Sequence, residues 1–228
     1  MIGLGRRAAR PGALAYAAAD RPAPSTPWNR ARWCAVDLEL SGLDPRRSEI
    51  ISFGAVPIDD GRILLSGAVE GLVAPTRPLS ESSIVIHGIR SADLADARPL
   101  EEAIDPLLAA MAGRVVVAHV ARVERAFLAR ALRRQGLRFR GPVADTDVLG
   151  RLWLCERDGS VPPRRSLHEL AGALGLPAHG EHDALGDALT AAQVFIAATS
   201  HLHALCGETV GSLTRAQHRL DAALTYSR

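Results

Sequence analysis

Hydrophobic and polar positions alternate in the first half of the chain, and this spacing predicts strands. Residues 33–45 read WCAVDLELSGLDP, a half-apolar strand that ends in a Ser-Gly-Leu-Asp-Pro turn. Two apolar segments follow, EIISFGAVPI at 49–58 and RILLSGAVEGLVAP at 62–75, with a turn at 59–62. We expect the three strands to form an antiparallel meander, with a bulge or break at the glycines of the third.

In the second half the spacing changes to helices separated by short strands. The expected elements are a helix at 99–111, a buried strand at 115–119, a helix over VERAFLARALRR, a short VAD strand, a helix through Leu152, a helix opened by the capping box Ser166-x-x-Glu169, a core helix at about 183–199 and a terminal helix beyond Gly207. This order predicts an α/β domain of three layers, with a mixed sheet flanked by helices.

The composition fits one soluble globular domain. The chain is 47% hydrophobic and 23% charged, and no stretch reaches the roughly 18 apolar residues of a membrane span, so we expect no membrane association. The domain should cover residues 32–200, between an Ala/Arg/Pro-rich extension at 1–31 and a helical extension at 201–228. Arg6 and Arg7 precede an apolar run that is too short and alanine-rich for a signal peptide, so we expect a flexible or loosely packed extension with a loose helix at 11–19.

Charge and cysteine content bear on the ligand class and on the cellular compartment. The net charge is +2, and all 27 basic side chains are arginine, which suits phosphate but is also typical of a GC-rich genome. The three cysteines form no CxxC pair, which favours a reducing cytoplasm and argues against a zinc site or a disulfide framework.

Two acidic side chains lie within the first expected strand. Because alternate residues of a strand share a face, Asp37 and Glu39 point the same way. No cationic residue lies between them, and like charges at this spacing are unfavourable unless a cation binds them. The pair therefore predicts a divalent metal site.

A further carboxylate, Glu124, falls in the first turn of the helix after the buried strand. Its neighbours three and four residues away are all uncharged and apolar, so no surface ion pair explains it. It should lie at the edge of the helix face that turns toward the sheet. The alternative is a solvated glutamate that the helix dipole favours.

The segment at 182–188 reads HDALGDA. With Asp183 as N-cap the helix begins there, so His182 stays on the preceding loop while Asp187 is fixed on the helix. Two helical residues five apart would point about 140° away from each other, and this helix start lets both side chains reach one site. Alone, such a histidine is more often a surface residue than a base. The acidic segments favour the base.

Five ordered motifs carry a resemblance to a known family. They are Asp37-x-Glu39-x-Ser41-Gly42-Leu43, Ile86-His87-Gly88-Ile89, Val117-Ala118-His119, Asp145-Thr146 and His182-x-Ala184-Leu185-x-Asp187-Ala188. In this order they resemble the DEDDh 3′-to-5′ exonucleases, which include the epsilon proofreading subunit of bacterial DNA polymerase III, the polymerase C exonuclease domain and ribonuclease T. The resemblance covers about residues 33–200 and implies a ribonuclease-H-like fold and two-metal hydrolysis of phosphodiesters.

The resemblance also implies a role for each site residue. Two Mg²⁺ or Mn²⁺ ions would be held by Asp37, Glu39, Glu124 and Asp187, and His182 would act as the general base in releasing a nucleoside 5′-monophosphate. The expected contacts to the terminal nucleotide come from Leu40, Ser41, Gly42, Leu43 and His119. His87 and His119 are expected to bond loop backbone rather than a metal.

The family's second motif usually reads His-Asn-Ala-x-Phe-Asp, whereas residues 119–124 read HVARVE. A glutamate still ligates a metal, but its extra methylene moves the carboxylate by about 1 Å, and misplacement of that order can cost about 10²-fold in rate. We favour a compensated, active site. The alternative is a non-catalytic nucleic-acid-binding or polymerase-accessory module.

The expected substrate is the single-stranded 3′ end of a nucleic acid. DNA is favoured and RNA is the rival, because the first motif also resembles oligoribonucleases. A small-molecule phosphodiesterase is a third hypothesis. A DNA polymerase or repair protein is a candidate partner, with the terminal segments, 1–31 and 207–228, as candidate contact regions, and the sequence decides neither this association nor the oligomeric state.

Overall fold

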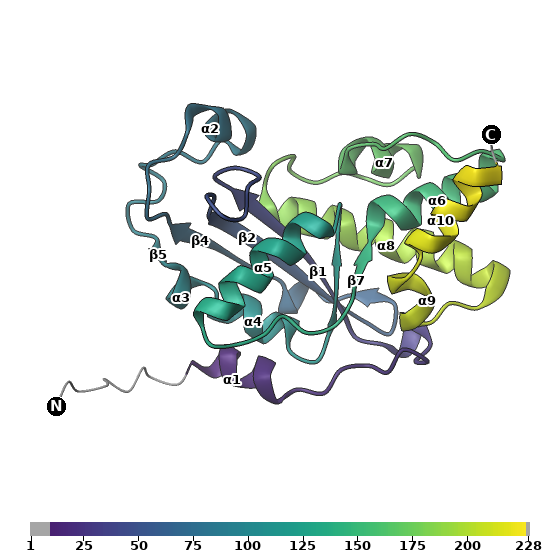
Figure 1. Cartoon of the computed structure of the whole chain (residues 1–228), viewed down its shortest axis with the longest axis horizontal. Coiled ribbons are helices and arrows are strands. Elements are labelled where there is room, and N and C mark those ends of the chain that lie inside the picture. Colours follow the sequence, from purple (N-terminus) through teal and green to yellow (C-terminus); the bar gives the residue numbers. More distant parts are fainter. Residues whose placement is uncertain (1–9, 227–228) are drawn as a thin grey trace.

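In a computed structural model of the protein, residues 10–226 are described, and they form a mixed seven-stranded sheet with helices on both faces (Figure 1). The strands are β1 Trp33–Leu40, β2 Ile50–Asp59, β3 Arg62–Ile63, β4 Val69–Ala74, β5 Arg98–Pro99, β6 Val115–Ala118 and β7 Val143–Asp145. Their order is β5-β4-β2-β1-β6-β7, and β3 pairs with β2. Since β1, β2 and β4 are antiparallel neighbours while β6 and β7 run parallel to β1, the predicted α/β fold is confirmed.

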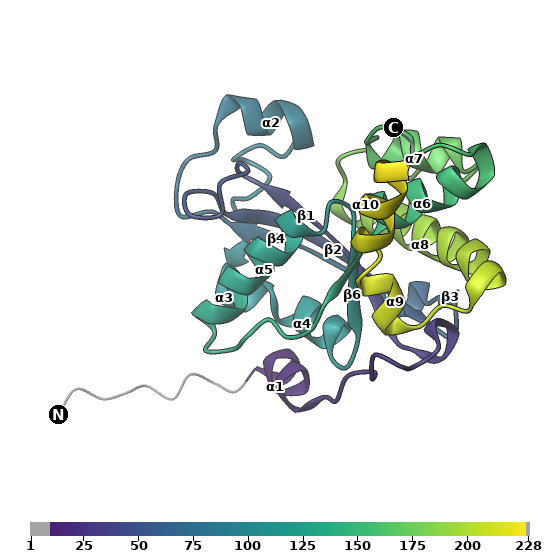
Figure 2. The ribbon, with the colours of Figure 1, turned by 45° about the vertical axis from the view of Figure 1, so that its right-hand side comes forward.

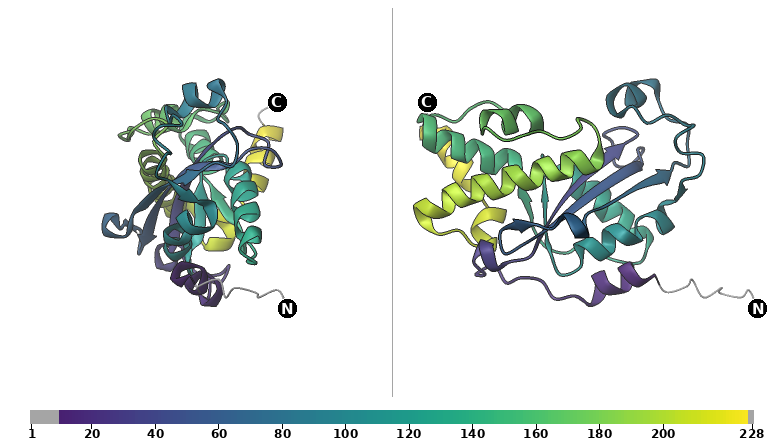
Figure 3. Two further views of the ribbon diagram at one scale, coloured as in Figure 1. Left: turned by 90° about the vertical axis from the view of Figure 1, so that its left-hand side faces the viewer. Right: turned by 180° about the vertical axis from the view of Figure 1, so that it is seen from behind.

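Ten helices are present within the described residues. They are α1 Pro11–Ala18, α2 Glu81–His87, α3 Leu100–Ala103, α4 Asp105–Met111, α5 Arg122–Arg134, α6 Thr146–Asp158, α7 Leu167–Ala173, α8 Ala184–Cys206, α9 Val210–Thr214 and α10 Gln217–Tyr226, with short 3₁₀ turns at Trp28–Arg30 and Leu65–Gly67. Figure 3 shows α8 crossing one face of the sheet, with α4 and α5 on the other.

The alternation along β1 divides the core into two layers. Trp33 and Ala35 face α6 and α8, where the rings of Trp33 and Phe195 have centroids 4.7 Å apart. Cys34 and Val36 face α4 and α5. Both faces of β1 are therefore buried, as its central place in the sheet requires.

Two expected elements are divided in the structure. The third strand is interrupted by the 3₁₀ turn at Leu65–Gly67, so β3 and β4 each pair with β2. The helix expected over 99–111 is split at Ile104 into α3 and α4. Pro106 in the first turn of α4 has no N–H to donate to the preceding turn, which explains the split.

The second half also differs in helix lengths. α6 continues beyond Leu152 to Asp158 and ends at Gly159 with φ 73°. α8 continues to Cys206, and the expected terminal helix consists of the two separate helices α9 and α10. Both pack on the core through buried apolar side chains, among them Leu213 and Leu220.

The segment before β1 is packed against the domain, in contrast to the loose extension expected. Figure 2 shows α1 beside α4. The Asp105 carboxylate accepts the N–H groups of Gly12 and Ala13 at 3.0 and 2.9 Å, and Tyr16 is 4% exposed. Residues 1–9, including Arg6 and Arg7, lie outside the described residues.

Among residues 10–226, α8 is the one helix that is long and apolar enough to cross a membrane by length and composition. It lies along the sheet, and its buried residues include Phe195, Ala198 and Asp187. Its apolar composition is therefore explained by its contact with the core.

Replacing Tyr16 by alanine should destabilise the protein, because the ring is buried and its hydroxyl accepts the Arg140 N–H at 3.3 Å. The free energy of unfolding, measured by urea denaturation, should fall by about 3 kcal/mol. Leu14→Ala on the same helix, where the side chain is 58% exposed, is the control and should change it by less than about 0.5 kcal/mol. Equal effects of the two substitutions would contradict the docking of α1.

Candidate active site

The acidic residues predicted from the sequence meet where the central strands of the sheet reach their carboxyl ends. The parallel strands β1, β6 and β7 end there, and α5 and α8 begin there. Asp37 and Glu39 lie near the end of β1, His119 directly follows β6, and Asp145 is the last residue of β7. In sheets of this kind, the carboxyl ends of the strands are the usual place for a ligand.

A glycine in β2 allows α8 to approach this edge. Gly54 pairs with Asp37 across the β1–β2 ladder, and a Cβ atom on Gly54 would lie 2.1 Å from the carbonyl oxygen of Ala184. Only a residue without a side chain permits this approach. The first turn of α8 therefore lies against β2 beside Asp37, which brings Asp187 to the site.

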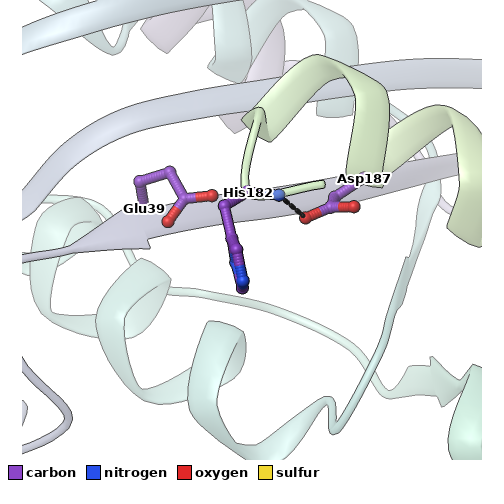
Figure 4. A group of neighbouring side chains, drawn as sticks. All are labelled: Glu39, His182 and Asp187. Carbon is purple, nitrogen blue, oxygen red and sulfur yellow. Dashed lines mark hydrogen bonds between the residues drawn. The ribbon is translucent and has the colours of Figure 1, made fainter. Parts of the chain in front are cut away.

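The start of α8 has the arrangement expected from its sequence. The Asp183 side chain caps the helix by accepting the Gly186 N–H at 2.9 Å. His182 precedes the helix in a left-handed conformation, φ 60°, and its N–H donates to Asp187 Oδ2 at 3.1 Å. Ligand atoms of Glu39, His182 and Asp187 lie within 4.8 Å of one another, and Figure 4 shows the imidazole beside the two carboxylates.

Asp37 and Glu124 complete the acidic group. Burial raises the pKa of Asp37 well above its ordinary value, and the charges of Glu124, Asp187 and Glu39, in that order, raise it further. Burial also raises the pKa of Glu124 to about 8. This side chain is 7% exposed, so it faces the sheet and is not the solvated glutamate of the alternative interpretation.

Glu39 and Asp187 share this environment. Burial raises the pKa of Glu39 to about 7, with the charges of Asp187 and Asp183 adding to the shift. Burial likewise raises the pKa of Asp187, although His168, the His182 backbone N–H and the His182 side chain oppose the rise. All four carboxyls are therefore held in a setting that disfavours their charged forms.

The donor set fits divalent metal ions. One oxygen of Glu124 and one of Asp187 are buried without a hydrogen-bond partner. No arginine within residues 10–226 forms an ion pair with any of the four carboxylates. Hard dications take carboxylate oxygens as ligands, and two of them would balance four negative charges. The grouping is therefore explained by cation binding better than by internal ion pairing.

A histidine that the sequence did not reveal contacts this group. His168 on α7 places Nε2 3.4 Å from Asp187 Oδ1, and both atoms are buried without a hydrogen bond. The capping box at the start of α7 is present as predicted, but it indicates only where the helix begins. A polar residue in the first turn of a short apolar helix is the only sequence signal for this contact.

Both ring nitrogens of His119 have hydrogen-bond partners within the protein. Its Nδ1 lies 3.0 Å from the Thr146 hydroxyl and its Nε2 lies 3.2 Å from the Arg165 carbonyl oxygen. The expected contact with loop backbone is therefore present, and no ring nitrogen is left for a nucleotide. His87 likewise accepts the Ile89 N–H at 3.0 Å through Nδ1.

Of the residues expected to meet the terminal nucleotide, Leu40 is the last residue of β1, and Ser41, Gly42 and Leu43 follow it in a loop that is closed by bonds at Ser41. Ser41 and Glu49 exchange two bonds of 2.9 Å, from Ser41 N–H to the Glu49 carbonyl and from Glu49 N–H to the Ser41 hydroxyl. Leu40 is partly buried, whereas Leu43 is 79% exposed. Within this set, Leu43 is the side chain most available to a ligand.

The start of α5 follows a residue in an unfavourable backbone conformation. Val120 has φ 53°, a left-handed conformation that is rare for a β-branched residue. The helix has no capping side chain of its own. Instead, the Asp145 carboxylate accepts the N–H groups of Val120 and Ala121 at 3.1 and 2.9 Å. Asp145 thus fixes the first turn that carries Glu124.

Comparison with known proteins identifies the class. The sequence model of the exonuclease family, RNase_T, matches residues 34–195. A DNA polymerase III PolC-type protein of Thermotoga petrophila is 34% identical over 170 residues, which are 74% of this chain and 12% of that protein. The DNA polymerase III subunit epsilon of Aquifex aeolicus is 30% identical over 165 residues, 71% of this chain and 77% of that protein.

Solved structures agree with this match. Exonuclease X in complex with 5′-overhanging duplex DNA aligns with a TM-score of 0.61 and 25% identity, over 81% of this chain and 98% of that one. Exonuclease I of E. coli with a dT13 oligonucleotide aligns with a TM-score of 0.65 and 14% identity, over 76% and 42%. The fold is therefore ribonuclease-H-like. The chain belongs to the exonuclease family, and it spans only 12% of the length of the PolC-type protein.

Val120→Asn should stabilise the protein by about 1 kcal/mol, because asparagine adopts the left-handed conformation at lower cost than valine. Val120→Gly should also stabilise it, since glycine has no Cβ to strain. The free energy of unfolding from chemical denaturation measures both. A loss of stability in both variants would show that Val120 is not strained.

Glu124→Gln should change how stability depends on pH. The unfolded chain releases the Glu124 proton near the ordinary pKa of 4.5, whereas the folded protein holds it to about pH 8. Between these values the folded state binds more protons, so wild-type stability falls as pH rises. Measured with chelator present, the variant should gain about 2 kcal/mol or more over wild type between about pH 5 and 8. The exposed Glu156→Gln is the control, and parallel curves for Glu124→Gln and wild type would mean that Glu124 is solvated.

Proposed function

We propose that this protein is a metal-dependent 3′-to-5′ exonuclease that hydrolyses the terminal phosphodiester of a single-stranded end and releases a nucleoside 5′-monophosphate. The observation that carries the proposal is the convergence of four largely buried carboxylates with a histidine at the carboxyl edge of the sheet. A binding module has no need of a general base, and a structural acidic group would have internal cationic partners.

In this proposal Asp37, Glu39, Glu124 and Asp187 hold two divalent ions, Mg²⁺ or Mn²⁺. When bound, such ions activate a water as nucleophile and stabilise charge on the leaving oxygen. Glu124 reaches the site from the first turn of α5, which Asp145 fixes. We expect this fixed helix start to accommodate the longer side chain that replaces the usual aspartate.

His182 is suited to take a proton from the attacking water. Its ring lies beside Glu39 and Asp187, while its side chain remains 49% exposed, so the proton can pass on to solvent. The bond from its own N–H to Asp187 Oδ2 ties the base to a metal-holding carboxylate. The left-handed conformation of His182 is the local strain that this position carries.

The similarity to these relatives favours DNA as the substrate of this protein. Several of them are DNA polymerase III proteins, and the two solved structures with similar folds contain DNA. An association with a DNA polymerase is part of the same proposal, with the terminal segments as contact regions. RNA remains the comparison substrate in the assay, because one pocket at the 2′ position decides between the two.

The test is the progressive shortening of 5′-labelled single-stranded DNA and matched RNA, with Mg²⁺ or Mn²⁺ and with chelator, while chromatography identifies the released products as nucleoside 5′-monophosphates. Activity should require a free 3′ end, stop with chelator and return with added metal. Asp37→Asn and Asp187→Asn should abolish it, and His182→Ala should lower the rate by about 10² to 10⁴-fold. Glu156→Gln, which lies outside the site, is the control and should keep full activity.

Other outcomes separate the alternatives. Strand binding without any monophosphate in either metal would favour the non-catalytic module. Cleavage of dinucleotides without cleavage of longer strands would favour a small-molecule phosphodiesterase. If Glu124→Asp is more active than wild type, the glutamate impairs the site instead of completing it.

A further inference from the structure

The loop before α7, residues 159–166, is attached to the wall of the site. The Arg165 carbonyl oxygen lies 3.2 Å from His119 Nε2, and the Pro162 carbonyl accepts the Arg151 Nε–H at 3.0 Å. These contacts join the loop to the ends of β6 and α6. The loop is therefore a fixed part of the site and not a free surface segment.

Two further contacts hold the same segment from either side. Arg164 Nε lies 3.6 Å from Asp147 Oδ2, a carboxylate that is 2% exposed. Arg151 Nη1 lies 3.5 Å from the same oxygen, so Asp147 already has one cationic partner. Beyond the loop, His168 touches Asp187. The segment from Arg164 to His168 is thus anchored beside a carboxylate of the site.

The anchored loop presents positive charge to solvent. The Arg164 side chain is 60% exposed despite its ion pair. Arg165 is exposed and has no ion pair within residues 10–226. We call Arg164 and Arg165 the arginine rim.

The opposite side of His182 has the reverse charge. A cavity of about 560 Å³ lies there. Its lining includes Glu70, Glu181 and Asp183 but no arginine. Phosphates would be repelled from that side and attracted to the arginine rim, because the exposed charges of each side act at short range. The two sides of the site therefore differ in their fit to a polyanion.

We propose that the arginine rim binds the phosphates of the substrate strand behind its terminal nucleotide, so that the strand leaves the site along the α7 side. This rests on the proposed function, in which a strand end enters the site. Each phosphate contact by an arginine releases counterions. It adds about 0.7 to the magnitude of the slope of log K against log salt for single-strand binding. The rim should act on long strands and not on a dinucleotide, which has no phosphate beyond the scissile one.

The test compares Arg164→Gln/Arg165→Gln with wild type in binding a labelled twelve-nucleotide single strand, with chelator present to prevent hydrolysis. The slope of log K against log salt should fall in magnitude by about 1.4 in the double variant. The ratio of the wild-type binding constant to that of the double variant should therefore fall by about sevenfold when the salt concentration rises from about 50 to about 200 mM. With metal, KM for the long strand should rise while turnover of a dinucleotide stays unchanged.

The matched control is Arg62→Gln/Arg98→Gln, which removes two exposed charges from β3 and β5 at other edges of the sheet. Arg165→Gln alone breaks no ion pair and should give about half the change in slope, and Arg164→Lys/Arg165→Lys should restore most of it. If the rim variant binds like the control, or if wild type binds no strand, the proposal is wrong. If wild type binds and the slope changes but no mononucleotide is released, the strand path holds while the proposed hydrolysis fails.

Discussion

Repulsion among four largely buried carboxylates is the constraint on which the rest of the structure depends. Asp37 lies on the central strand, where loss of solvent contact raises its pKa, and the charges of Glu124, Asp187 and Glu39 raise it further. Such a group is unfavourable in a folded protein unless rigid elements hold it and a cation binds it. The sheet supplies that rigidity, because β1 is buried on both faces. The site is thus held by the packing of the core rather than by attraction among its own members.

Residues outside the acidic group hold its members in place through particular hydrogen bonds. Asp145 carries no chemistry in the proposal, yet its carboxylate accepts two N–H groups at the start of α5 and the Asp147 N–H at the start of α6. These bonds hold the start of α5, from which Glu124 lies against the sheet.

Local sequence patterns were enough to predict the features that depend on residues close together in the sequence. The alternation along β1 placed Asp37 and Glu39 correctly, and Asp183 as N-cap placed His182 on a loop and Asp187 on a helix. Contacts between distant segments left no such pattern. The need for glycine at Gly54 arises only when α8 crosses β2, and His168 meets Asp187 only through the packing of α7. The docking of Tyr16 on the domain is of the same kind, because an alanine-rich segment shows little periodicity of its own.

The asymmetry of the site follows from the same contacts. His119 and Thr146 lie within two of the motifs predicted to carry the site, and they contact each other, while His119 also lies against the Arg165 carbonyl. Their effect is to fix a loop whose arginines face solvent beside the carboxylates. In the proposed strand path, losing these bonds would leave the charges of Asp37 and Asp187 in place and would release the loop whose arginines orient the strand.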